Sequence, residues 1–129
     1  IASQIAARLG LDNTPSESVF AQLAKTAHGL EMVRALLQCP LHISSGYRSP
    51  EVNKAVGGKP NSQHQTGQAV DFTAPQYGTP EQIIKAIVGS IIPYDQCILE
   101  FNQWVHISFS DQPRKQALII DKTGTRLYG

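Results

Sequence analysis

Charged side chains, cysteines and long apolar runs are all scarce in this sequence. Charged residues form 16% of the 129 positions and nearly cancel, to a net charge of +1. This balance gives no electrostatic reason to expect nucleic acid or an anionic membrane as a partner. No apolar run approaches the roughly 20 residues that a transmembrane helix needs. The first residues, IASQIAARLG, have neither a basic start nor a long apolar segment, so we expect no signal peptide there.

Only two cysteines are present, Cys39 and Cys97. Two cysteines do not form a disulfide framework, and their spacing matches no zinc-finger pattern. Both have apolar neighbours, in LLQCP and QCILEF, so we expect buried free thiols. The chain has no internal repeat and no low-complexity linker, and its length suits one buried core. We therefore predict a single domain over residues 1–129.

Three segments carry helix start signals. Thr14–Glu17 combines a capping threonine, a proline and a glutamate three residues after the cap, so a long helix should begin there and end before Pro40. Ser49–Glu51 should start a short helix that the next pair of glycines ends, and Thr79–Gln82 forms a capping box. The first helix should bury the apolar residues that recur at spacings of three and four: Val19, Phe20, Leu23, Ala27, Leu30, Val33 and Leu37.

The last third of the chain changes its period. QCILEF, WVHISF and ALIID have the composition of strands, and Lys122–Gly124 forms a turn near the end. QAVDFTA predicts an earlier strand with alternating sides, and LHISSG predicts a short one. The main helices come early and most strands come late, with tight turns between the strands. This order predicts an α+β fold with a largely antiparallel sheet and the helices packed on one side.

Four histidines are present, and two of them receive no role. His28 falls inside the first helix and His42 at the start of a strand, where hydrogen-bonded or exposed histidines are the ordinary case. His64 and His106 differ in what accompanies them. In QAVDFT, the strand period of two places Asp71 on a face of short side chains, with no basic residue nearby in the sequence. A buried carboxylate at that position needs a partner.

A zinc ion is the partner that the histidines suggest. In WVHISF, His106 lies on the face opposite to the apolar residues. Catalytic zinc commonly has three protein ligands and a water, and histidine nitrogen and carboxylate oxygen are among its usual ligands. His64, Asp71 and His106 would supply this set. The alternative, on spacing alone, is a polar loop that runs into an ordinary strand.

Glu100 is a candidate fourth residue of this site. In CILEF it faces away from the apolar residues. If this strand and WVHISF pair so that both apolar faces meet one core, Glu100 lies directly opposite His106, across a three-residue loop Asn102–Trp104. A glutamate beside a zinc-bound water can take its proton and pass it to a leaving amine. The alternative is that Glu100 is an exposed, solvated strand residue.

Three stretches of the sequence together resemble a known family. They are SGYRSPEVNKAVGG, the pattern S-x-H-x-x-G-x-A-x-D over Ser62–Asp71, and EFNQWVHISF. They are similar to the zinc D-Ala-D-Ala carboxypeptidases and L-Ala-D-Glu endopeptidases, a family that includes VanX-type dipeptidases and phage endolysins. The similarity runs over about Thr14–Phe109. The resemblance implies the fold shared by hedgehog signalling domains and DD-peptidases, and zinc held by His64, Asp71 and His106.

The resemblance also implies roles for Arg48 and Ser62. Arg48, in the Y-R-S-P segment, would bind the scissile carbonyl oxygen and its developing negative charge. A guanidinium suits this role because it stays charged and presents several fixed donors. Ser62 would help to position the peptide. On the sequence alone, Arg48 is equally compatible with a surface turn.

One position departs from the family pattern. In many members the catalytic acid/base lies three residues before the last histidine ligand, and this chain has Gln103 there. Glutamine cannot take a proton. Either Glu100, which lies six residues before His106, fills the role or catalysis is impaired. The strand pairing proposed above supports Glu100.

Two functions are compatible with these residues. The first is a zinc metallopeptidase that hydrolyses peptidoglycan stem peptides, as a D-Ala-D-Ala carboxypeptidase or an L-Ala-D-Glu endopeptidase. The second is a zinc-containing module that has lost turnover and binds the cell wall or belongs to a virion. We expect a monomer with no nucleic-acid partner and no transmembrane segment. It should work in the periplasm or cell wall, or as part of a phage virion or lysis product.

Overall fold

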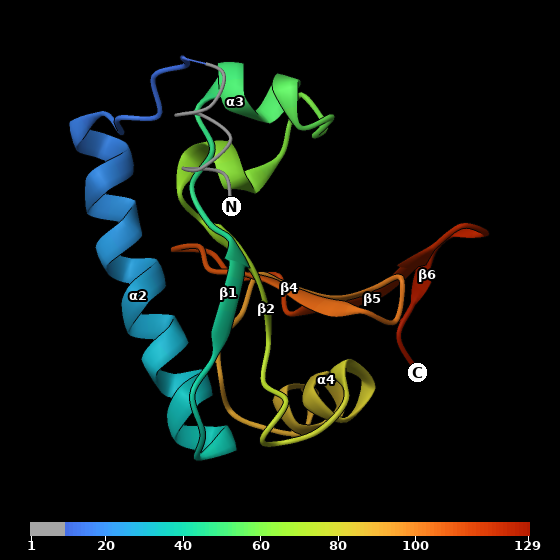
Figure 1. The fold of residues 1–129 in the computed structure, drawn as a ribbon. Helices are drawn as coiled ribbons and strands as arrows, with labels where there is room; N and C mark the ends of the chain where they lie inside the picture. Colours follow the sequence, from blue (N-terminus) through green and yellow to red (C-terminus); the bar gives the residue numbers. More distant parts are fainter. Residues whose placement is uncertain (1–9) are drawn as a thin grey trace.

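A six-stranded sheet lies at the centre of the protein, for which the computed structural model describes residues 10–129 (Figure 1). The segment IASQIAARLG, in which we expect no signal peptide, lies outside this range except for its last residue. The described elements, in chain order, are α2 (Glu17–Leu37), β1 (His42–Ser45), α3 (Pro50–Ala55), the 3₁₀ helix η1 (Gln63–Thr66), β2 (Ala69–Thr73), α4 (Pro80–Val88), β3 (Gln96–Glu100), β4 (Trp104–Ser108), β5 (Gln116–Asp121) and β6 (Gly124–Leu127).

The strands lie side by side in the order β1-β2-β4-β3-β5-β6. Four of the five neighbouring pairs are antiparallel, and β3 and β5 are parallel. The fold is therefore α+β with a mixed sheet, which agrees with the predicted class and with a largely antiparallel pairing. The β5 and β6 strands extend away from α2, toward the right in Figure 1. Within residues 10–129, no helix is both long enough and apolar enough to span a bilayer.

Two of the helices share one hydrophobic core with the sheet. The core contains buried residues of α2 (Val33, Leu37), of α4 (Ile83, Ile84, Ile87) and alternate residues of the three central strands (Val70, Phe72, Cys97, Leu99, Val105, Ile107). The short helix α3 is different, because its buried Val52 packs with Leu11 in a separate small cluster. The prediction that the helices pack on one side is thus right for α2 and α4 and wrong for α3.

The side chains without an assigned role lie mostly as expected. His28 and His42 are both exposed. Both cysteines are free, with Cys97 buried in the core and Cys39 half-buried beside it. The prediction of buried free thiols is therefore confirmed for Cys97, whose pKa is raised by burial, and holds only in part for Cys39.

Polar capping residues set the starts of the helices. Ser16 caps α2, because its hydroxyl accepts a hydrogen bond from the backbone N–H three residues ahead. The prediction of Thr14 as the cap is wrong. Its backbone N–H is instead bound by the carboxylate of Asp12 at 2.8 Å, in a turn that precedes the helix. Ser49 and Thr79 cap α3 and α4 as predicted, and Thr79 forms the expected capping box.

The buried face of α2 matches the prediction at Val33 and Leu37 but differs from it elsewhere. Phe20 is 69% exposed, whereas Thr26 and Gly29 are buried. The Thr26 hydroxyl donates to the carbonyl of Gly67 at 2.6 Å, and the ring of Phe109 packs directly on Gly29. Contact through small residues brings α2 close to the segment between η1 and β2. Apolar spacing alone does not predict these two contacts, because they involve a hydroxyl and a glycine.

We expect Gly29→Val to lower the free energy of unfolding by about 2 kcal/mol, since overpacking typically costs about 1–3 kcal/mol. Even a Cβ atom at Gly29 would lie 2.5 Å from the Phe109 ring. Ala35→Val is the matched control, because Ala35 is exposed on the same helix. Its cost should stay below about 0.7 kcal/mol, the range of helix propensity. Urea unfolding followed by circular dichroism measures both, and equal losses would contradict the packing argument.

Candidate metal centre

The three predicted metal ligands meet on the face of the sheet opposite to the helical core. Asp71 of β2 and His106 of β4 are direct cross-strand partners. His64 comes from η1, which ends at Gly67 with a φ of 77°. A Cβ atom at Gly67 would also lie 3.1 Å from the side chain of Leu23. Glycine therefore allows the tight turn that leads from η1 into β2.

The donor atoms of these side chains converge. Asp71 Oδ1 lies 3.0 Å from His106 Nδ1 and 3.3 Å from His64 Nε2. One ligand atom from each residue lies within 4.8 Å of the other two. The two imidazole rings meet edge to face, with centroids 5.1 Å apart. All three side chains are buried, so the structure brings the predicted set together in one enclosed cluster.

This cluster fits a zinc ion. Ligand distances of about 2.0–2.2 Å in a tetrahedral site place donor atoms roughly 3.4 Å apart, close to the two separations from Asp71 Oδ1 to the histidine nitrogens. His64 Nδ1 lies 2.8 Å from the carbonyl of Gly46. If Nδ1 donates to that carbonyl, Nε2 directs its lone pair toward the cluster, which is how histidine ligands are commonly oriented. Two imidazole nitrogens and one carboxylate oxygen are a donor set that catalytic zinc uses.

Arg48 lies beside the cluster, in the loop between β1 and α3. Its backbone N–H donates to the carbonyl of His64 at 2.9 Å, which joins this loop to η1. Its Nη1 donates to Asn53 Oδ1 at 3.2 Å, and its Nη2 lies 3.9 Å from Asp71 Oδ2. The side chain is 12% exposed, and among the described residues its Nε has no hydrogen-bond partner. The guanidinium is therefore fixed next to the cluster with donor capacity left over.

The predicted pairing of Glu100 is wrong in register. In the β3–β4 pair, Glu100 lies opposite Trp104, and Ile98 lies opposite His106. Because this shift of two residues preserves the alternation of a strand, Glu100 still faces the same side as His106. Glu100 Oε1 lies 3.5 Å from His106 Nδ1, and the Glu100 side chain is 18% exposed. The structure thus brings Glu100 to the cluster along a diagonal across the two strands.

The loop between β3 and β4 accounts for the shift. The backbone N–H of Gln103 donates to the carbonyl of Glu100 at 3.0 Å, and Phe101 and Asn102 between them have φ values of 53° and 54°. Two successive left-handed residues closed by such a bond are characteristic of a type I′ turn. Asparagine tolerates this geometry, but phenylalanine rarely adopts it. The loop therefore starts at Phe101, and Trp104 becomes the first residue of β4.

Gln103 and Ser62 lie outside the cluster of donor atoms. Gln103 is exposed in the loop. The Ser62 hydroxyl accepts a hydrogen bond from the backbone N–H of His64 at 3.1 Å and caps η1. Ser62 therefore orients the segment that carries a predicted ligand. Its role in positioning a peptide stays a prediction.

Burial and neighbouring charges separate the pKa values of the two carboxyl groups. Burial raises the pKa of Glu100, an effect that His106 opposes and Asp71 reinforces. Burial also acts to raise the pKa of Asp71, but its interactions with His106 and His64 hold that pKa well below its usual range. Burial lowers the pKa of Arg48, although the two carboxylates partly offset it. A carboxyl group suited to proton transfer thus lies beside one that stays ionised.

A groove of about 710 Å³ opens over the cluster. Such a volume is typical of ligand sites that hold small molecules or short peptides. The side chains around it include those of Val56, Lys59, Arg48, Phe101, Trp104 and Arg114, and its floor includes Ile98, Leu118 and Ile120.

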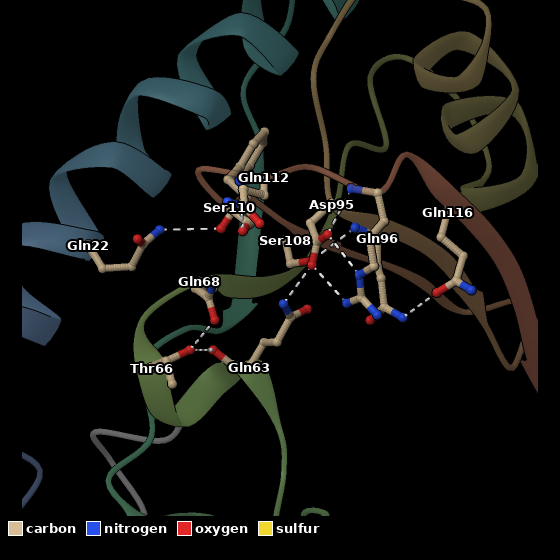
Figure 2. A network of polar contacts seen from close by, with 12 residues as sticks. Gln22, Gln63, Thr66, Gln68, Asp95, Gln96, Ser108, Ser110, Gln112 and Gln116 are labelled. Carbon is tan, nitrogen blue, oxygen red and sulfur yellow. Dashed lines mark hydrogen bonds and ion pairs between the residues drawn. The ribbon is translucent and has the colours of Figure 1, made fainter.

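Asp95 anchors η1 to the sheet (Figure 2). Its carboxylate, 2% exposed, accepts hydrogen bonds from Gln63 Nε2 at 2.7 Å and from the backbone N–H and side chain of Arg114 at 2.8–2.9 Å. The hydrogen bonds from Arg114 hold the pKa of Asp95 well below its usual range. Gln63 directly precedes His64, so the same carboxylate braces the turn of η1 that carries a predicted ligand.

Sequence reasoning missed the residues that brace the centre. Gly46 and Asp95 reach η1 from 18 and 32 positions away in the chain, and neither contact follows from a local spacing. The resemblance pointed to the segment that contains Asn53, but no role was assigned to that residue. Its buried amide receives a hydrogen bond from Arg48.

Comparison with known protein families gives a match over most of the chain. A family model described as Peptidase M15 matches residues 1–108. The matched range includes the three residues of the cluster, Arg48 and Glu100. No curated protein matches the chain.

Zinc should stabilise the folded protein. A ligand that binds only the folded state adds about 2.7 kcal/mol when its free concentration is 100-fold above its Kd. Zinc should therefore raise the Tm of the parent, and a chelator should reverse the shift. Asp71→Asn should lose most of the response, whereas His42→Ala, which alters an exposed histidine, should keep it. Calorimetric titration gives the stoichiometry, and unchanged zinc binding by Asp71→Asn would contradict the assigned ligand.

Asp95→Asn should make stability less sensitive to acid. Because the folded-state pKa of Asp95 is lowered, its ionised form stabilises the protein above the unfolded pKa of about 3.9. This contribution is lost as the pH falls from about 5 toward the folded-state pKa. The variant should be less stable by about 1–2 kcal/mol at neutral pH and fall less steeply in acid. Asp111→Asn is the control, because Asp111 pairs with Lys25 on the surface. Parallel curves for parent and Asp95→Asn would refute the assignment.

Proposed function

Because this chain belongs to the peptidase M15 family, a family of metallopeptidases, we propose that it uses zinc to hydrolyse the stem peptides of peptidoglycan. The observation that carries the proposal is the buried cluster of His64, Asp71 and His106, with Glu100 beside it in an open groove. In this arrangement, a metal site, a proton acceptor and space for a peptide adjoin one another.

His64, Asp71 and His106 would hold the zinc. Bound there, zinc supplies a Lewis acid that polarises a carbonyl group and makes a water more acidic. Glu100 takes a proton from the attacking water and delivers it to the leaving amine. Its raised pKa suits this exchange, because a group that titrates closer to neutral pH both accepts and donates more readily.

Arg48 stabilises the developing oxyanion. Its guanidinium lies within 3.9 Å of the Asp71 carboxylate and keeps an unpartnered Nε among the described residues. A buried, pre-oriented cation stabilises negative charge more strongly than water does, and it needs no reorganisation during the reaction. Burial of the side chain keeps this donor in one position.

The alternative is a zinc-containing module that binds the cell wall or belongs to a virion and has lost turnover. Gln103, which cannot act as a base, favours it. The position of Glu100 favours catalysis instead, because its carboxylate is 3.5 Å from His106, whereas Gln103 is exposed in the loop. We propose that the enzyme acts outside the cytoplasmic membrane, where peptidoglycan lies.

Mass spectrometry of defined peptidoglycan fragments tests this function and identifies the bond. Loss of one terminal alanine would indicate a D-Ala-D-Ala carboxypeptidase. A break between L-Ala and D-Glu would indicate an endopeptidase. If no fragment is cleaved while one zinc is bound per chain, the proposed hydrolysis is wrong and the binding module replaces it.

Glu100→Gln should lower kcat by about 10²–10⁴-fold, the usual contribution of a general base, and leave one zinc per chain. Gln103→Ala is the matched control from the neighbouring loop and should stay within about threefold of the parent, since Gln103 is exposed. Zinc content by atomic absorption separates loss of metal from loss of proton transfer. Full activity of Glu100→Gln would show that another group moves the proton.

A further inference from the structure

The groove extends beyond the metal cluster, over the neighbouring strands β3 and β5 of the sheet. The register of the sheet places His106 opposite Ile98 and Ile98 opposite Leu118. The next row of the same face pairs Glu100 with Ile120. All of these residues line one groove. The row that carries the predicted ligands thus continues into an apolar floor on β3 and β5.

A cation borders the groove at the end where β3 and β5 begin. Arg114, in the loop before β5, lines the groove with a side chain that is 55% exposed. Its Nε and Nη2 are bound to Asp95, which fixes the plane of the guanidinium. Among residues 10–129, its Nη1 makes no hydrogen bond. The neighbouring amides of Gln96 and Gln116 are joined at 2.7 Å across β3 and β5 (Figure 2).

Strand spacing gives the approximate distance between the residue that anchors this cation and the row of the metal cluster. Asp95, which holds Arg114, is three residues before Ile98, and Ile98 is directly opposite His106. At about 3.3 Å per residue of extended chain, the backbone of Asp95 is roughly 10 Å from that of Ile98. An extended peptide of about three residues covers the same length. A substrate group on Arg114 is therefore two or three residues from the bond at the metal cluster.

The charges along the groove favour an anion at this position. Asp71 and Glu100 lie at the centre, and they repel a substrate carboxylate there unless Arg48 or the metal neutralises them. Arg114 is a half-exposed cation that a buried carboxylate holds in one orientation, so little side-chain freedom is lost on binding. Lys59 also lines the groove and is exposed, but no hydrogen bond with another described side chain orients its ammonium group.

We propose that Arg114 forms a subsite for a substrate carboxylate, two or three residues from the scissile bond, with the intervening aliphatic side chain on Ile98 and Leu118. The inference rests on the proposed function and names the part of the substrate that the far end of the groove recognises. The matched family range ends at residue 108, so it does not include Arg114. The carboxylate is either the chain terminus or a side chain of a continuing peptide.

Binding is measured separately from hydrolysis. Trp104, the only tryptophan of the chain, lines the groove and reports on its occupancy by fluorescence. Zinc-loaded Glu100→Gln protein is titrated with tetrapeptides from the stem, each in three forms: free acid, terminal amide, and side-chain amide. The free acid should bind about tenfold more tightly than the one amide that removes the recognised carboxylate. Which amide loses affinity identifies the source of the carboxylate.

Variants of Arg114 then test whether this residue forms the subsite. Arg114→Gln should abolish the preference for the acid, and Arg114→Lys, which keeps a cation beside Asp95, should keep part of it. The Kd values for the acid and the amide are compared within one protein sample. A general loss of structure from the missing contact with Asp95 affects both values and cancels in their ratio. Arg126→Gln, on exposed β6, is the control and should keep the full preference.

Several results would overturn the subsite. They are equal binding of acid and amides by the parent, no binding of any peptide, or a preference that Lys59→Gln removes and Arg114→Gln keeps. Hydrolysis by protein with Glu100 intact is scored in parallel. Cleavage without acid preference rejects the subsite and leaves the proposed function standing. Acid preference without cleavage supports the subsite and rejects catalysis.

Discussion

The pairing of Asp71 with His106 across β2 and β4 is the constraint on which the rest of the site depends. Side chains of a strand alternate, so a slip of one residue would turn Asp71 into the helical core and Val70 and Phe72 out of it. An unpaired carboxylate in that core would cost several kcal/mol. The burial of Phe72 in the core that α2 and α4 share with the sheet therefore keeps Asp71 on the face that carries His106.

Alternation is also the part of the site that the sequence could predict. It placed Asp71, Glu100 and His106 on one face, and the structure agrees because apolar residues on the other face fill the core. The register between β3 and β4 was not predictable in the same way. It depends on a turn in which Phe101 adopts a left-handed conformation, and residue preferences argue against that choice. The loop thus overrides a local preference, whereas the core enforces the alternation.

Contacts between distant segments were the least predictable. The hydrogen bonds from His64 to Gly46 and from Gln63 to Asp95 join segments with no shared pattern, and they depend on where the folded sheet places η1. Part of the buried face of α2 was missed for a related reason. Thr26 is buried because its hydroxyl has a partner in Gly67. Hydropathy does not predict such a contact, because it does not count the hydrogen bond that allows a polar group to be buried in a core.

The hairpin of β5 and β6 supplies much of the groove floor but none of the residues of the metal cluster. It also follows the last residue of the matched family range. Substitutions at Leu118 or Ile120 would therefore change the groove floor without removing a donor atom of the cluster. Part of the groove surface is thereby encoded outside the segment that carries the predicted ligands, so this part can vary without replacing a donor atom.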